Sequence, residues 1–221
     1  MTTASVTPGD LGFDAAHAAP AAPATTENAF LAGNPAALGI PVFVAGSVAL
    51  ALALIGYVPA TAVGAPLAII AAATGLGLTI ATIWAAAVGQ SAVASIFGIF
   101  GGFWLSYAAL VLGLLHNWFA ITPSAAVHTQ GLFLISWIVI MSMLTLATLR
   151  LPLAFTAIFA LVVLALVAVL IGTINASTGW LKAGGVLVFA FAAVGVYVYF
   201  SIGSAMTGGP DLPLGKPVMK T

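Results

Sequence analysis

Between Asn28 and Pro210 the sequence contains no aspartate and no glutamate, and apolar residues follow one another almost without interruption from Asn34 to about Ser204. Soluble domains carry about 25% charged residues, whereas charged residues make up 4% of this chain. A surface that faces water cannot be built from so few charges. The sequence therefore predicts an all-α polytopic membrane protein.

The apolar stretch divides into six runs of about the length that a spanning helix needs, which is about 20 residues. The predicted spans cover about residues 38–58, 66–88, 92–115, 129–149, 153–174 and 180–201. We therefore expect a flexible N-terminal tail (1–33), a six-helix transmembrane domain (34–203) and an irregular C-terminal tail (204–221). No apolar run precedes the first span, so a cleaved signal peptide is not expected.

The four basic residues predict the orientation, because cytoplasmic loops carry an excess of Lys and Arg. Arg150, Lys216 and Lys220 fall on one side of the predicted membrane, and Lys182 falls on the other. Six spans place both termini on the same side. The sequence therefore predicts a protein of the plasma or inner membrane with both termini in the cytoplasm.

The sequence lacks the residues that several functions would need. The spans contain no carboxylate pair for acid–base chemistry, and the chain has no cysteine for a thiolate nucleophile or a metal site. No span holds two histidines at metal-ligand spacing, and the formal net charge of zero does not indicate nucleic acid. We therefore expect neither an enzyme nor a cofactor or metal site.

The first span begins with Asn34-Pro35-Ala36-Ala37-Leu38-Gly39. Asparagine is a favoured N-cap, because its side-chain oxygen accepts from free N–H groups of the first turn. Proline suits the first helical position, where its missing N–H costs nothing. The segment predicts a helix start.

Two motifs together resemble the acetate uptake transporter family, the YaaH-like succinate–acetate permeases. One is the first-helix motif, with Asn34, Pro35, Leu38 and Gly39. The other is the third-helix motif Phe100-Gly101-Gly102-Phe103-Trp104-Leu105-Ser106, which is similar to the family's aromatic-Gly-x-Phe-Trp-Leu pattern. The resemblance covers about residues 33–203. It implies a transporter of small carboxylates that assembles as a homo-hexamer, with one pore in each protomer.

The chain departs from the family pattern in two places, one residue and one segment. Phe100 stands where relatives often carry Tyr, so a hydroxyl is missing there. The end of the second span reads Trp84-Ala85-Ala86-Ala87-Val88-Gly89-Gln90, without the polar or acidic residues that members commonly have. A coupling mechanism that uses those side chains does not transfer to this chain.

The resemblance also implies a constriction made by the first, third and fifth helices, which places Phe43, Phe100 and Val162 in it. At 1.5 Å per residue, the three side chains lie at depths of about 12, 14 and 16 Å from one membrane face. The hydrocarbon core is about 30 Å thick, so all three are expected near its midplane. The alternative is that they are core residues that share a depth by chance.

Hydroxyl side chains are the other candidates for a pathway, and Thr156 is the one we expect in the pore. Each hydroxyl can instead bond to a carbonyl of its own helix. The full set within the spans is Ser47, Thr74, Thr79, Thr82, Ser95, Ser106, Thr145 and Thr156.

We therefore predict a transporter or channel for acetate and related small monocarboxylates, with succinate as a further candidate. Because the spans hold no acidic proton carrier, the proton is expected to cross together with the substrate. A passive channel for small solutes such as acetic acid, urea or ammonia is one alternative. A membrane subunit that transports nothing is the other.

Overall fold

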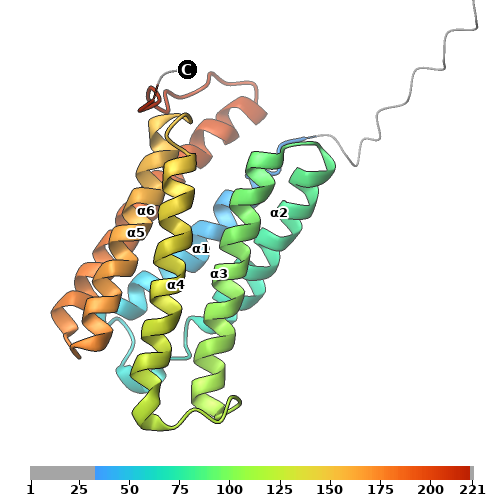
Figure 1. Ribbon diagram of the computed structural model, residues 1–221. Coiled ribbons are helices and arrows are strands. Elements are labelled where there is room, and N and C mark those ends of the chain that lie inside the picture. Colours follow the sequence, from blue (N-terminus) through green and yellow to red (C-terminus); the bar gives the residue numbers. More distant parts are fainter. Residues whose placement is uncertain (1–32, 220–221) are drawn as a thin grey trace, which may run out of the picture. The chain divides into compact units, whose positions relative to one another are not determined.

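The computed structural model describes residues 33–219, and these residues form a bundle of long helices (Figure 1). The predictions about the N-terminal tail, and the position of Lys220, lie outside this range. The long helices are α1 (Ala36–Ile55), α2 (Leu76–Ala87), α3 (Ser91–His116), α4 (Ala126–Ala147), α5 (Leu153–Ile174) and α6 (Thr178–Met206). The short ones are η4 (Ala60–Ala62), the π-helical η5 (Ile69–Gly75) and η6 (Pro123–Ala125).

Six helices in the described range are long and apolar enough to cross a membrane, when η5 is joined to α2 and η6 to α4. No strand occurs between residues 33 and 219. The prediction of an all-α chain with six spans is confirmed. The chain is a multi-pass membrane protein.

Two helix boundaries differ from the prediction. The fourth span begins at Pro123 instead of about residue 129, because proline is well tolerated in a first helical turn. The last helix continues to Met206, so residues 204–206 belong to α6 and not to an irregular tail. The helix continues past the end of the apolar run, because helical hydrogen bonds do not require apolar side chains.

The helices pack unevenly around the bundle. Helix α6 lies along α1 and α5, α5 also packs on α4, and α2 packs on α3. In contrast, α3 contacts α1 and α4 over short stretches only. The starts of α1, α3 and α5 lie at the end of the bundle that also carries the C-terminal segment, which we call the terminus-bearing end (Figure 1).

Helix α1 ends at a glycine because the chain turns there through a left-handed conformation. Gly56 has φ 89°, and the N–H of Tyr57 donates to the carbonyl of Leu52 over 2.9 Å. This is the pattern of a Schellman C-cap. It leads the chain into the turn before η4 at the opposite end of the bundle.

The C-terminal segment after α6 is not helical, yet hydrogen bonds hold it against the bundle. The carbonyl of Leu214 accepts from the N–H of Ala154 over 2.9 Å, in the first turn of α5. The carbonyl of Pro213 accepts from the Tyr197 hydroxyl over 2.9 Å. The segment therefore satisfies an N–H group that a helix start leaves free.

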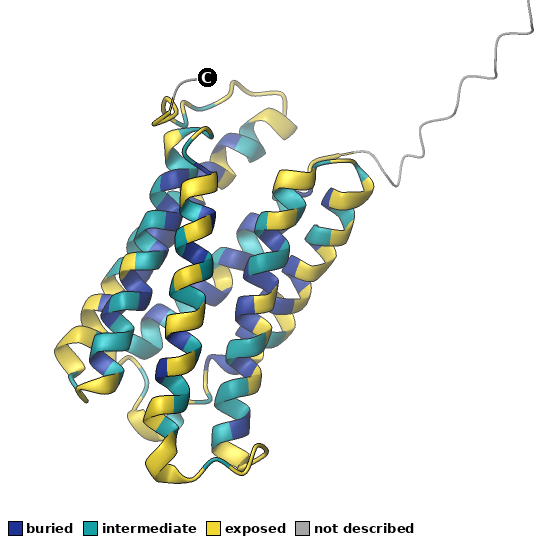
Figure 2. Cartoon of the chain, in the orientation of Figure 1, coloured by how far each residue is buried: buried dark blue, intermediate teal, exposed yellow. Residues whose placement is uncertain are grey.

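Exposed residues recur along the long helices (Figure 2), and many of them are large and apolar. Ile80 and Ile83 of α2 and Leu132 and Val139 of α4 are examples. Such a surface is unfavourable in water and suits lipid or a neighbouring subunit. Inside, glycines such as Gly185 face a neighbouring helix closely, as is typical of helices in membranes.

Candidate functional site

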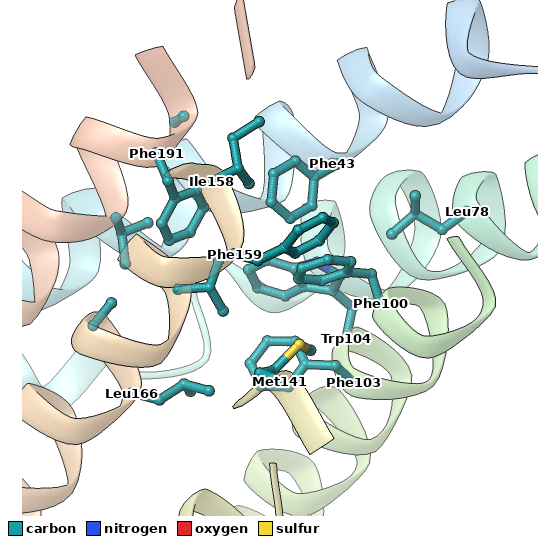
Figure 3. Close-up of a cluster of buried hydrophobic side chains, with 14 of the residues drawn as sticks. Phe43, Leu78, Phe100, Phe103, Trp104, Met141, Ile158, Phe159, Leu166 and Phe191 are labelled. Carbon is teal, nitrogen blue, oxygen red and sulfur yellow. The ribbon is translucent and has the colours of Figure 1, made fainter. Parts of the chain in front are cut away.

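A cluster of buried aromatic rings occupies the centre of the bundle (Figure 3). Phe43 of α1 and Phe100 of α3 meet edge to face, with ring centroids 4.8 Å apart. Both side chains are buried. The two phenylalanines that the sequence places at a similar depth are thus in direct contact.

Two further phenylalanines extend this pair on both sides. Phe191 of α6 stacks on Phe43 at 5.6 Å, and Phe159 of α5 stacks on Phe100 at 5.6 Å. We call these four rings the phenylalanine layer. Phe159 and Phe191 were not among the residues predicted for the constriction, because nothing in the sequence pattern indicates which ring of α5 or α6 turns inward.

Val162, the third residue of the predicted constriction, is buried and lies on α5, three residues after Phe159. It lines a cavity next to Phe43 and Phe100. The ring from α5 that stacks on Phe100 belongs to Phe159. The role of Val162 in a constriction stays a prediction.

A cavity of about 100 Å³ lies between the phenylalanine layer and the terminus-bearing end. Every described residue that lines it is apolar or glycine. We call it cavity 1; its walls are Ala36, Ile40, Phe43, Leu78, Val93, Ile96, Phe97, Phe100, Phe155, Ile158, Phe159 and Gly195.

A second cavity of about 70 Å³, cavity 2, lies on the other side of the Phe43–Phe100 pair. Phe43 and Phe100 line both cavities, so this pair separates them. Trp104 and Tyr107 are the lining residues with a polar side-chain atom. The walls of cavity 2 are Phe43, Leu50, Leu54, Phe100, Phe103, Trp104, Tyr107, Phe133, Leu134, Val162, Ala165, Leu166, Val169, Val188 and Phe191.

A third and wider space, cavity 3, measures about 470 Å³ and reaches the opposite end of the bundle. It shares Leu50, Tyr107 and Val169 with cavity 2, so the two adjoin. Its walls include the polar side chains of Gln130 and Thr173. Of the described residues that line the three cavities, none is charged.

The three cavities follow one another along the bundle. On α3 the lining residues progress from Val93 through Phe100 and Tyr107 to Val111. At 1.5 Å per residue this run extends about 27 Å, close to the thickness of the hydrocarbon core, about 30 Å. The cavities therefore form a series as long as a membrane is thick, interrupted at the phenylalanine layer.

Of the segment 34–39 that carries the first-helix motif, Ala36 lines cavity 1, whereas Asn34, Pro35, Leu38 and Gly39 line none of the three cavities. The Asn34 side-chain oxygen accepts from the N–H of Ala36 over 3.0 Å, as expected for a cap. Pro35 is buried, and Leu38 packs against the core. A side chain at Gly39 would collide with the ring of Phe97, so this glycine allows α1 to approach α3 closely.

The third-helix motif divides between two faces of α3. Phe103 and Trp104 line cavity 2. Gly101 faces α2, where an added Cβ would lie 3.5 Å from the side chain of Thr79. The Ser106 hydroxyl donates to the carbonyl of Gly102 over 2.6 Å.

Seven of the eight candidate hydroxyls donate to backbone carbonyls. Thr156 donates to the carbonyl of Thr148 over 2.8 Å, which ties the end of α4 to α5, and it lines none of the three cavities. Several others donate to the carbonyl four residues earlier, as is common in membrane helices: Ser47, Thr79, Thr82 and Thr145.

Six membrane-length helices around a series of uncharged cavities, with aromatic rings between the first two cavities, define a polytopic membrane protein. The chain belongs to the GPR1/FUN34/yaaH family, whose model matches residues 16–207. This confirms the resemblance that the two motifs indicated.

A curated relative is the meiotically up-regulated gene 86 protein of Schizosaccharomyces pombe (strain 972 / ATCC 24843). It is 33% identical over 135 residues, which is 58% of this chain and 42% of the relative. The chain thus matches less than half the length of that protein. Among solved structures, the bacterial acetate channel SatP superposes with a TM-score of 0.73 at 23% identity, covering 83% of this chain and 99% of SatP. The two proteins share a fold.

Proposed function

We propose that this protein carries acetate and related small monocarboxylates across a membrane, with succinate as a further substrate. The observation that supports this most is the series of three cavities, which extends about as far as the hydrocarbon core is thick and has the phenylalanine layer between cavity 1 and cavity 2. Membership of the GPR1/FUN34/yaaH family and the fold shared with an acetate channel support the same substrate class.

The proton crosses with the substrate in this proposal. The described residues that line the three cavities include no carboxylate, histidine or lysine that could carry a proton separately. An unpaired anion in cavity 1 or cavity 2 would meet apolar walls, where burying a charge is very costly. A small neutral acid avoids that cost and can pass between aromatic rings after losing its water.

The protein is proposed to work as a homo-hexamer in the plasma or inner membrane, with both termini in the cytoplasm. The hexamer rests on the family resemblance, and each protomer would hold its own route because one chain encloses all three cavities. Arg150 and Lys216 both lie at the terminus-bearing end, and Lys182 lies at the other. This distribution favours cytoplasmic termini.

The test is uptake of radiolabelled acetate into proteoliposomes that contain the purified protein, with and without a pH gradient. Uptake that a gradient accelerates supports movement with a proton. Equal flux of acetic acid, urea and ammonia would identify a passive solute channel instead. Absence of flux for every solute, from protein that is folded and inserted, would leave the proposal without support.

A further inference from the structure

The π-helical turn η5 (Ile69–Gly75) packs on both of the helices that carry the Phe43–Phe100 pair. Helices α1 and α3 contact each other over short stretches only. A π-helical turn is rare and occurs frequently at functional sites. Because η5 contacts both helices, its position affects how far apart the Phe43 and Phe100 rings lie.

One hydrogen bond joins η5 to α1 directly beside Phe43. The fully buried Thr74 hydroxyl donates to the carbonyl of Val42 over 2.7 Å. A Cβ at Gly46, one turn further along α1, would collide with the Thr74 side chain, so this glycine makes room for it. Val42 precedes Phe43 in the chain, and the bond therefore restrains the backbone that carries the ring.

Helix α1 lacks one of its own hydrogen bonds just before Phe43. Pro41 lies inside the helix, and a proline has no N–H to donate to the carbonyl four residues earlier, which kinks or weakens a helix. The buried Ser47 hydroxyl donates to the carbonyl of Phe43 over 2.7 Å. Two successive carbonyls of α1 thus each accept from a buried hydroxyl, and of these two hydroxyls the one on Thr74 belongs to another helix.

The next residue of η5 contacts the other helix of the pair. A Cβ at Gly75 would collide with the side chain of Leu105, which lies on α3 five residues after Phe100. Thr74 and Gly75 are consecutive, so the same turn holds α1 by a hydrogen bond and packs closely on α3. This turn therefore acts as a spacer between the two helices.

We propose that Thr74 is a positioning residue that sets the separation of Phe43 from Phe100, and thereby the size of acid that passes from cavity 1 to cavity 2. The inference rests on the proposed function, because this pair separates the two cavities along the proposed route. Thr74 lines none of the three cavities, so it acts through the α1 backbone and does not touch the solute. Without the bond, α1 moves more freely near Pro41 and the Phe43 ring withdraws from Phe100.

The experiment measures the ring position and the size selectivity separately on the full chain. For the first, 4-fluorophenylalanine is incorporated at position 43, and its ¹⁹F resonance is recorded in nanodiscs. For the second, fluxes of acetate and succinate are measured in proteoliposomes without the label and normalised to folded protein. Thr74→Val removes the donor and keeps the side-chain shape, whereas Thr74→Ser keeps the hydroxyl. Thr145→Val is the matched control, because it removes a hydroxyl bond of the same 2.7 Å length within α4, and Thr145 lines none of the cavities.

We expect Thr74→Val to shift or split the ¹⁹F resonance and to raise the ratio of succinate flux to acetate flux about two- to tenfold, the effect of one hydrogen bond. Thr74→Ser and Thr145→Val should retain the resonance and the flux ratio of the unsubstituted protein.

Gly77→Ala tests the same spacing independently and decides the question if Thr74→Val does not fold. Its Cβ would lie 3.0 Å from the Val42 side chain, so it pushes on α1 from α2, while alanine itself is favourable in a helix. It should also shift the ¹⁹F resonance of the ring at position 43.

Other outcomes overturn the positioning role. An unchanged resonance and flux ratio in Thr74→Val, even with a lower melting temperature, would make its bond a structural one alone, and normal acetate flux would leave the proposed function standing. A shifted resonance with an unchanged flux ratio would show that the ring does not control passage. Equal behaviour of Thr74→Ser and Thr74→Val would exclude the hydroxyl as the cause. If the unsubstituted protein carries no acetate while the resonance responds as expected, the proposed function fails and Thr74 still positions the ring.

Discussion

The Phe43 ring meets the Phe100 ring edge to face, with centroids 4.8 Å apart, at the level where cavity 1 gives way to cavity 2. An aromatic pair in this geometry contributes about 0.5–1.5 kcal/mol beyond the area it buries. Joining the two cavities at this level therefore requires at least one of these rings to move.

If this contact is a gate, Phe43→Ala and Phe100→Ala should raise acetate flux per folded protomer and admit succinate more readily, because the apolar barrier is thinner. Flux of both acids is measured in proteoliposomes and normalised to folded protein. Phe97→Ala is the matched control, since Phe97 is as buried as Phe43, 7% exposed, but lines cavity 1 alone.

Phe43→Ala and Phe100→Ala, the two gate variants, also each leave a cavity, which costs about 3–5 kcal/mol of stability. Phe97→Ala carries a similar cost, so a loss of expression shared by all three variants reports stability and not gating. Unchanged size selectivity in both gate variants would defeat the gate hypothesis. Val162→Ala, measured in the same way, tests whether the third predicted residue contributes.

Asn34→Ala should impair transport more than folding. The variant loses the bond from the Ala36 N–H, which costs about 0.5–2 kcal/mol. The N–H groups of residues 36–39 all have partners, but Ala36 also lines cavity 1, so loss of the cap should disturb the wall that acetate passes. Asn34→Ser keeps the cap and should restore the half-saturating acetate concentration. Normal flux in Asn34→Ala would show that Asn34 is a structural cap alone.

Acetate uptake should rise steeply as the external pH falls from 7 to 5 at constant total acetate. A simple carboxylic acid with a pKa of about 4–5 is roughly one part in a few hundred neutral at pH 7 and about half neutral at pH 5. The initial uptake rate is measured across this range in proteoliposomes. A flat profile would contradict movement as the neutral acid.

Gly39→Ala should destabilise the protein, although alanine in a helix is normally favourable by about 0.5–1 kcal/mol. The added Cβ meets the Phe97 ring, and overpacking of this kind costs about 1–3 kcal/mol. A Cβ added at Gly203 on α6 has no atom within 4 Å, so Gly203→Ala should be neutral or slightly stabilising. Melting temperatures in one detergent compare the two. Equal stability of both variants would mean that Phe97 moves away freely.

The orientation can be tested cleanly because the chain contains no cysteine. Lys182→Cys and Lys216→Cys each introduce one exposed thiol, at opposite ends of the bundle. With cytoplasmic termini, a membrane-impermeant maleimide labels Lys182→Cys in intact cells. It should label Lys216→Cys only after the membrane is opened. The reverse pattern would place the termini outside.

The membrane class, the six helices and the depth of each residue follow from the sequence. Apolar runs of spanning length exclude a water-facing surface, and Asn34 with Pro35 marks where the first helix begins. Because an α-helix rises by a constant 1.5 Å per residue, Phe43 and Phe100 could be placed at one level before their contact was known.

The direction in which each side chain points was decided by the tertiary structure. Helices such as α1 and α5 are apolar on every face, so periodicity does not show which face turns inward. Contacts of α6 with α1 and of α5 with α3 select Phe191 and Phe159 as partners of the central pair. Packing of α5 on α4 directs the Thr156 hydroxyl to the carbonyl of Thr148, away from the cavities. The packing around α3 leaves the Trp104 N–H without a partner among the described residues. Depth is a property of one helix, whereas direction depends on which helices become neighbours.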